Sequence, residues 1–107
     1  LGQCVVATIG YGGKHVAVYS KSQWEIKKNE LRSMPADNSK ESVTRRMLLG
    51  YSYEQDIDSA GRILLPHQLR KRAGINQEVS INGNMDHLEI WDMNEWDSFG
   101  VGDSDWS

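Results

Sequence analysis

Two tracts of the chain, 72 positions apart, carry the same order of strand, turn, strand and helix start. In each tract an apolar run and an alternating run flank a turn rich in Gly or Asn, as in a half-buried hairpin. A repeat this long predicts a duplicated domain rather than a solenoid, and 107 residues suit one domain built from two similar halves. The expected strands are 5–9 and 15–19 in the first tract and 79–81 and 87–91 in the second, around turns at 10–13 and 82–84.

Each tract ends on a helix-start signal. Ser20 with Gln23 fits the capping box, and Asp92 with Glu95 fits its close Asp variant. We therefore expect a helix directly after the second strand of each tract.

Between the tracts, residues 51–65 predict a strand, a tight turn and a second strand. Polar and bulkier residues alternate over 51–57, and Asp58-Ser-Ala-Gly61 is a four-residue turn signal. Residues 62–65 then predict a short strand that leads straight into a proline.

A short helix is expected after that strand. Pro66 suits its first position, because its φ is fixed and it has no N–H to donate. Leu65, Leu69 and Ala73 recur every four residues as a buried stripe, and Gly74 supplies a left-handed stop.

The repeat leaves one element without a counterpart. The strand, turn, strand and helix of residues 51–74 precede the second hairpin, but the equivalent positions before the first hairpin fall outside this sequence. We expect the chain to lack the first half of its first repeat, which would leave a sheet edge open.

Two further helices are expected between the first hairpin and residue 51. One follows Ser20 and stops before Pro35, and the other begins at Asn38 and ends at Gly50. The first runs through Trp24, Ile26 and Leu31, and the second is expected to bury Val43, Met47 and Leu48. The predicted organisation is 1–33 as the end of the first repeat, 34–50 as connector and helix, 51–99 as the second repeat, and 100–107 as a tail.

Charge is unevenly distributed along the chain. The formal net charge is −3, yet residues from Asp86 onward hold seven acids and no Lys or Arg, so the first 85 residues carry 12 basic against 8 acidic side chains. Four cations and no acid lie between residues 62 and 72: Arg62, Arg70, Lys71 and Arg72. A solvated helix face is the simplest interpretation of such a run, and polyanion binding is the other.

Several other residues are of types that could form a site. Cys4 lies in an apolar run and is expected to be a buried structural thiol in a reducing compartment. His15 and His87 occupy matching positions, but without further spaced ligands they favour strand-end histidines over a metal site. The glycine-rich segment 10–13 precedes a strand rather than a helix, which argues against a phosphate loop.

Four segments together form a specific combination: Arg45-Arg-Met-Leu-Leu-Gly50, Asp58-Ser-Ala-Gly-Arg-Ile-Leu-Leu-Pro66, Leu69-Arg-Lys-Arg-Ala-Gly74, and Leu88-Glu-Ile-Trp-Asp92 with Trp96. With the repeat, they resemble the MraZ family, relatives of the AbrB/SpoVT-type swapped-hairpin DNA-binding proteins, over roughly residues 1 to 99. The resemblance implies an α+β fold, a swapped-hairpin AbrB-like barrel of two tandem repeats with the first incomplete and with short flanking helices. It also implies a bacterial transcription factor, cytoplasmic and associated with the nucleoid. Such factors bind short promoter repeats of the division and cell-wall gene cluster and assemble into rings.

The family's motif of Asp, three residues and Arg falls on Asp58 and Arg62. A guanidinium at the close of a tight turn can meet phosphate or a guanine edge, and Arg70, Lys71 and Arg72 could add backbone contacts. Asp58 is expected to cap the turn or orient Arg62, whose competing role is a salt bridge to that carboxylate.

The sequence thus predicts a DNA-binding transcriptional regulator whose partners are double-stranded DNA and further copies of itself in a ring-like homo-oligomer. The alternative is a non-catalytic oligomerisation or protein-interaction module. We expect no enzymatic activity, catalytic residue, metal, cofactor, small-molecule substrate or membrane partner.

Overall fold

The computed structural model describes residues 4–34, 37 and 39–101, which form an α+β fold, as predicted. The elements in chain order are β1 (Cys4–Ile9), β2 (His15–Ser20), α1 (Lys21–Arg32), α2 (Lys40–Gly50), β3 (Tyr53–Asp56), α3 (His67–Ala73), β4 (Val79–Asn84), β5 (His87–Asp92) and α4 (Met93–Val101). The tail predicted from residue 100 begins inside α4, and its remainder lies outside the described residues.

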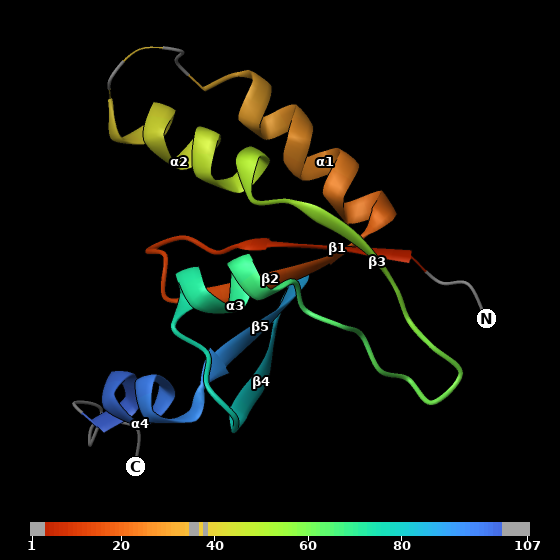
Figure 1. Ribbon diagram of the computed structural model, residues 1–107. Coiled ribbons are helices and arrows are strands. Elements are labelled where there is room, and N and C mark those ends of the chain that lie inside the picture. The colour runs from red at the N-terminus through yellow and green to blue at the C-terminus, as the bar shows by residue number, and fades with distance from the viewer. Residues whose placement is uncertain (1–3, 35–36, 38, 102–107) are drawn as a thin grey trace.

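The strands form one antiparallel sheet in the order β3-β1-β2-β5-β4. Two hairpins, β1–β2 and β4–β5, therefore meet along β2 and β5, where His15 lies opposite Trp91 and Ala17 lies opposite Glu89. The sheet is open among the described residues, with β3 and β4 as its edges (Figure 1).

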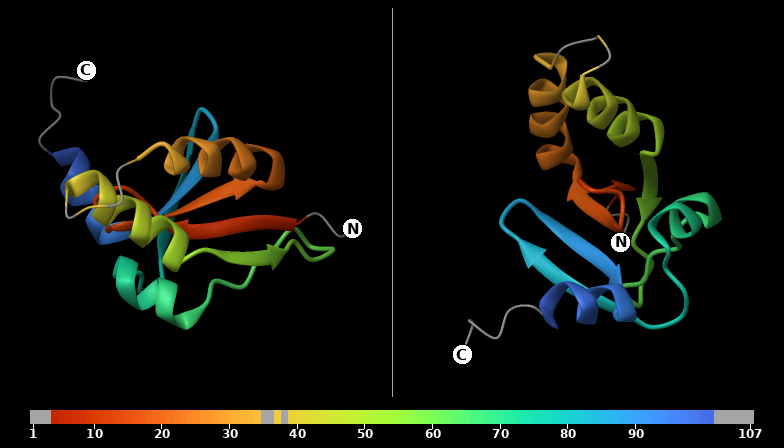
Figure 2. Two further views of the ribbon diagram at one scale, coloured as in Figure 1. Left: turned by 90° about the horizontal axis from the view of Figure 1, so that it is seen from above. Right: turned by 90° about the vertical axis from the view of Figure 1, so that its left-hand side faces the viewer.

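Each face of the sheet is covered by different helices. In the views of Figures 1 and 2, α1 and α2 lie on one side of β1 and β3, and α3 lies on the other. The core under α3 contains Ala7, Ile9, Val16, Val18, Leu69, Ala73, Ile75 and Ile90. The core under α1 and α2 contains Val6, Ala17, Tyr19, Trp24, Leu31 and Leu48.

The predicted start of α1 agrees with the structure, and the predicted start of α2 differs from it by one residue. The Ser20 hydroxyl accepts a hydrogen bond from the Gln23 backbone N–H at 3.2 Å, which confirms it as the N-cap of α1. Ser39, one residue after the predicted start, caps α2 by accepting from Ser42 N–H at 3.2 Å. The predicted start itself, Asn38, lies outside the described residues.

Asp92 is buried and caps two segments at once. Its Oδ2 accepts from the Asn94 backbone N–H at 3.1 Å, at the start of α4. Its Oδ1 accepts from the Asn76 backbone N–H at 2.9 Å, just after α3. The cap was predicted from the sequence, but the second bond was not.

Three predicted boundaries were wrong. Residues 62–65 form no strand, because the chain diverges from β3 after its turn and runs out beyond the sheet edge without a ladder partner (Figure 1). Residues 82–84 belong to β4, and the chain reverses at Met85 and Asp86, where Met85 takes a left-handed φ of 56°. Pro66 is the N-cap of α3 and not its first residue, since its ψ of 143° is extended.

Two apolar side chains in α1 and α2 face solvent, and one of them, Val43, was expected to be buried. Ile26 and Val43 are exposed, whereas Trp24 and Leu48 are buried. Successive helical residues are about 100° apart, so Ile26 points about 200° away from Trp24, and the stripe that meets the sheet cannot hold both.

The two hairpins are unequally covered. Ile9 and Val16 in the first hairpin are both 0% exposed, because they share a core with Leu69 and Ala73 of α3. Their counterparts 72 positions later, Ile81 and Leu88, are 60% and 46% exposed. An apolar strip along β4 and β5 therefore lies open on the face that α3 covers elsewhere.

Candidate nucleic-acid interface

The turn between β3 and α3 is built around the carboxylate of Asp58. Its Oδ1 accepts from the backbone N–H groups of Ala60 at 2.9 Å and Arg62 at 2.8 Å. Its Oδ2 accepts from the Arg62 Nε at 3.3 Å. Gly61 takes the left-handed φ of 80° that this tight turn requires, which glycine adopts without penalty.

This geometry joins both roles considered for Arg62. The guanidinium is paired with Asp58 through Nε, yet its side chain is 79% exposed. A paired and exposed guanidinium can still offer its remaining N–H groups to an external acceptor.

The short helix α3 is fixed by its buried side. Leu69 and Ala73 are buried against the sheet, and Gly74 ends the helix with a φ of 71°. The three basic residues between these anchors are consecutive and lie about 100° apart around the axis, so they spread over the outer half of the helix. These residues, Arg70, Lys71 and Arg72, are all exposed.

Two of the three cations are held by neighbouring groups. Arg70 Nη2 donates to the backbone carbonyl of Asn76 at 2.7 Å. Arg72 Nη2 lies 4.0 Å from Met47 Sδ, and its guanidinium carbon lies 5.9 Å from the centroid of the Tyr51 ring. The Lys71 ammonium has no hydrogen-bond or ion-pair partner among the described residues.

A hollow of about 460 Å³ brings part of the set together. It is lined by Tyr51, Gln68, Lys71 and Arg72. Arg62 is not part of it, because it lies on the loop that reaches out beyond β3 (Figure 1), and Arg70 is turned toward Asn76. Sequence reasoning missed Tyr51 and Met47, since nothing local shows that the end of α2 lies beside α3.

The other weighed candidates have ordinary environments. Cys4 is only partly buried, with its Sγ 3.8 Å from both the Val5 carbonyl and Glu54 Oε1. Residues 10–13 connect β1 and β2. Within the described residues, no three His, Cys, Asp or Glu side chains are grouped so as to hold a metal ion, and no helix is long and apolar enough to cross a membrane.

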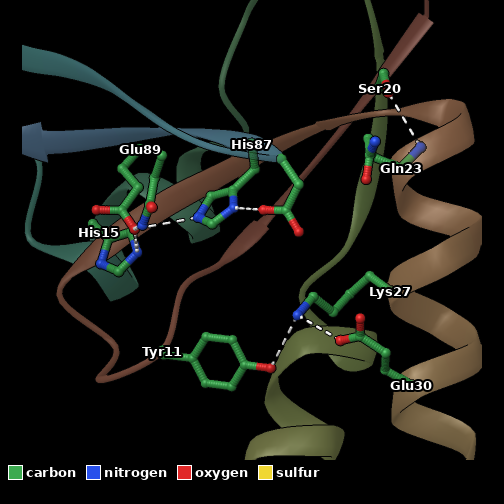
Figure 3. Close-up of polar contacts among 10 residues, drawn as sticks. Tyr11, His15, Ser20, Gln23, Lys27, Glu30, His87 and Glu89 are labelled. Carbon is green, nitrogen blue, oxygen red and sulfur yellow. Dashed lines mark hydrogen bonds and ion pairs between the residues drawn. The ribbon is translucent and has the colours of Figure 1, made fainter.

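The two matching histidines do meet, through a residue that sequence reasoning did not single out. Glu89 Oε2 lies 3.4 Å from His15 Nε2 and 3.2 Å from His87 Nε2 (Figure 3). The only signal in the sequence was the common spacing of the histidines, which does not reveal which strands pair.

The chain is similar to known proteins over most of its length. A family model described as "MraZ protein, putative antitoxin-like" matches residues 47–104, which include the turn, α3 and the second hairpin. The chain is 31% identical over 93 residues to a protein named transcriptional regulator MraZ from Alkalilimnicola ehrlichii, which covers 87% of the chain and 62% of that protein. It is 37% identical over 92 residues to the one from Photorhabdus laumondii, covering 86% of the chain and 60% of that protein. The chain thus spans less than two thirds of the length of these curated relatives.

Proposed function

The chain belongs to the MraZ family, and on that premise we propose that it contributes to a DNA-binding regulator of transcription. The curated relatives carry the name transcriptional regulator. The observation that carries the proposal is the turn that holds Arg62 by its backbone and Nε while leaving the guanidinium largely in solvent.

In this proposal Arg62 makes the contact that can read sequence. Its planar guanidinium matches the two acceptors of a guanine edge or the oxygens of a phosphate. Asp58 orients the side chain before DNA arrives, which reduces the entropy lost on binding. Lys71 adds a phosphate contact, and Arg70 and Arg72 flank it from more restrained positions.

We further propose that the targets are short promoter repeats of the bacterial division and cell-wall gene cluster, met in the cytoplasm at the nucleoid. Four cations from one copy neutralise few phosphates, so the affinity of one copy would be low. A ring-like homo-oligomer would repeat the patch and raise the effective concentration of each contact. The regulator has no catalytic role in this proposal.

The uncovered hairpin supports a fold of two repeats. Ile81 and Leu88 are exposed where Ile9 and Val16 are buried, and β4 has no outer neighbour in the described part of the chain where β1 pairs with β3. We propose that a second strand-turn-helix element covers β4 and β5 in the whole protein, as β3 and α3 cover β1 and β2. The two repeats would then complete the swapped-hairpin barrel.

The same strip also favours the second candidate function, a non-catalytic oligomerisation or protein-interaction module. An exposed apolar strip beside an unpaired strand edge is a surface on which another chain can add a strand. Under this alternative, the cations on α3 would be a solvated face with no ligand.

DNA binding across a salt series separates these functions. Binding of a duplex that carries the promoter repeats is measured by fluorescence anisotropy, for the chain and for a variant with Arg62, Arg70, Lys71 and Arg72 replaced by Ala. A matched control replaces Lys21, Lys28, Arg32 and Lys40 by Ala. It removes the same number of positive charges, but from α1 and α2. The proposal requires that the first variant bind more weakly and with a flatter salt slope than the control. Equal binding by both variants would leave the interaction module as the better interpretation.

A further inference from the structure

The seam between the two hairpins carries a polar cluster in which His15 is buried and the other two residues are partly buried. His15 from β2 and His87 and Glu89 from β5 lie on the face of the sheet that α1 covers (Figure 3). Both histidine Nε2 atoms point to the same carboxylate oxygen, at 3.4 Å and 3.2 Å. One carboxylate therefore links the strands of different hairpins.

The carboxylate and the rings are fixed by further contacts. Glu89 accepts from Asn84 Nδ2 at 2.9 Å and from Trp91 Nε1 at 3.0 Å. The His15 ring stacks on Trp91, with ring centroids 4.7 Å apart, and the His87 ring stacks on Tyr19 at 4.9 Å. These contacts hold both imidazoles in place across the seam.

The two histidines differ in the surroundings of their Nδ1 atoms. His87 Nδ1 lies 2.7 Å from Asp86 Oδ1, so each ring nitrogen of His87 faces a carboxylate oxygen. His15 Nδ1 is buried and has no hydrogen-bond partner among the described residues. Protonation of His15 would place an N–H there without an acceptor, which is costly in a buried position.

The His15 ring is closely packed between neighbouring groups. A Cβ at Gly10 would come within 2.0 Å of its Nε2, so the ring packs directly against the backbone of Gly10. The Trp91 ring stacks on the His15 ring, with the two ring planes 11° apart. The ring cannot turn Nδ1 to a new partner without disturbing the β1–β2 loop or the stack.

Electrostatics agree with this geometry. Burial lowers the pKa of His15 below its ordinary value of 6.5 and outweighs the attraction of Glu89, while His87 lowers it further. Burial alone would raise the pKa of Glu89, but hydrogen bonds from Trp91 and Asn84 outweigh it and lower that pKa. At neutral pH the seam holds a neutral His15 and an ionised Glu89.

Other titratable groups surround the cluster on every element packed against it. They are Tyr19 on β2, Tyr11 and Lys14 in the β1–β2 loop, Lys27 and Glu30 on α1, Asp86 in the β4–β5 turn and Glu95 on α4. Lys27 is engaged by Glu30 at 3.0 Å and by the Tyr11 hydroxyl at 3.3 Å, and Lys14 lies 4.0 Å from Glu95. No carboxylate other than Glu89 contacts His15 in the described structure.

We propose that the joint between the two hairpins is acid-sensitive, and that protonation of His15 loosens the β2–β5 pairing while the β1–β2 pairing stays intact. A histidine that binds its proton less readily when folded stabilises the fold fully only above about pH 6.5. That stabilisation is lost as the pH falls through the lower pKa that His15 has in the folded state. The β1–β2 and β4–β5 hairpins can then separate along β2 and β5, while Asp92 still joins the segment after α3 to the start of α4.

Nuclear magnetic resonance on the unmodified chain tests this directly. The His15 imidazole is titrated between pH 8 and pH 5, and nuclear Overhauser effects across the β2–β5 and β1–β2 ladders are recorded at each step. We expect a midpoint below 6.5 and a loss of cross-strand effects at β2–β5 that follows the His15 titration. A midpoint at or above 6.5, or equal weakening of both ladders, would overturn the proposal.

Urea unfolding gives an independent readout with a matched control. Between pH 7 and pH 5.5 the unfolding equilibrium constant should rise on the order of threefold or more in the unmodified chain. His67→Gln removes an exposed histidine from α3 and should keep this rise, whereas His15→Gln should largely abolish it. An undiminished rise in His15→Gln would contradict the role of His15. If that variant does not fold, the titration of the unmodified chain decides alone.

Discussion

Ala17 lies directly opposite Glu89 in the β2–β5 ladder, and the two residues are 72 positions apart in the sequence. The same offset relates the two aromatic stacks beside them, His15 on Trp91 and His87 on Tyr19. Positions that correspond in the repeat therefore face each other across the seam, as in two halves related by an approximate two-fold axis. Only one half places a carboxylate on that axis.

This asymmetry predicts that Glu89 stabilises the fold strongly. Glu89→Ala would leave the Nε2 atoms of His15 and His87 without the carboxylate that they contact, and an unpaired buried polar group costs about 1–3 kcal/mol. We expect a loss of about 2–4 kcal/mol in the free energy of unfolding by urea. Glu78→Ala, at an exposed position, should change it by less than about 0.5 kcal/mol. Similar losses for both variants would contradict this.

The unequal coverage of the hairpins gives a second prediction. Ile9→Ala removes a fully buried side chain and should cost about 2–5 kcal/mol, whereas Ile81→Ala at the equivalent position should cost below about 1 kcal/mol in this chain. Thermal and urea unfolding of both variants measure the difference. In a longer protein with the proposed second strand-turn-helix element, the two costs should converge. Persistent inequality there would refute the proposed cover over β4 and β5.

The turn at Asp58 gives a third prediction. Gly61→Ala places a side chain at a φ of 80°, where nothing lies within 4 Å, so strain alone opposes it and costs about 1–2 kcal/mol. If Arg62 contacts DNA, binding must hold the turn in this strained conformation. About 1 kcal/mol of the strain then opposes binding, so the affinity for DNA should fall on the order of fivefold. Gly50→Ala, in open space at the end of α2, is the control and should leave affinity unchanged. Anisotropy titrations with the repeat duplex report both.

Among the cations of α3, the unengaged one should have the clearest electrostatic effect. Lys71→Ala should flatten the logarithmic salt dependence of DNA binding by about 0.9, the value for one lost phosphate contact. Arg70→Ala should change the slope less, because its guanidinium is already bonded to the Asn76 carbonyl. Lys28→Ala on α1 serves as the reference for a cation away from the patch. A slope that is the same for all three variants would exclude Lys71 from the interface.

The core under α1 and α2, which contains Tyr19, gives a prediction about stability at alkaline pH. Burial raises the pKa of Tyr19 to about 12, against the opposing effect of Lys27. A phenol that holds its proton more tightly when folded stabilises the fold fully below about pH 10, and this stability is lost as the pH rises toward 12. The stability of Tyr19→Phe should therefore fall less steeply with rising pH above pH 10 than that of the unmodified chain. Circular dichroism during the pH titration measures this. Tyr53→Phe is the control, and an identical alkaline transition in both variants would argue against Tyr19.

Local patterns predicted the elements that depend on neighbours in the sequence. The helix cap at Ser20, the stripe of Leu69 and Ala73 and the left-handed stop at Gly74 all follow from spacing within one turn or two. The predicted strand at 62–65 failed because a strand exists only where another lies alongside, and alternation alone cannot supply that partner.

The candidate interface was predictable in composition but not in geometry. The cations could be counted, but the contact between Arg72 and Tyr51 joins residues 21 positions apart on separate elements. The bond from Glu89 to His15 depends on the pairing of β2 with β5, which residue periodicity does not encode.

One carboxylate, that of Asp92, holds both the backbone that leaves α3 and the backbone that enters α4. The two segments therefore cannot drift apart without breaking a bond in a position from which water is largely excluded. With the backbone hydrogen bond from Met93 N–H to the Glu78 carbonyl at 2.9 Å, this side chain fixes the start of α4 against the segment that follows the basic helix.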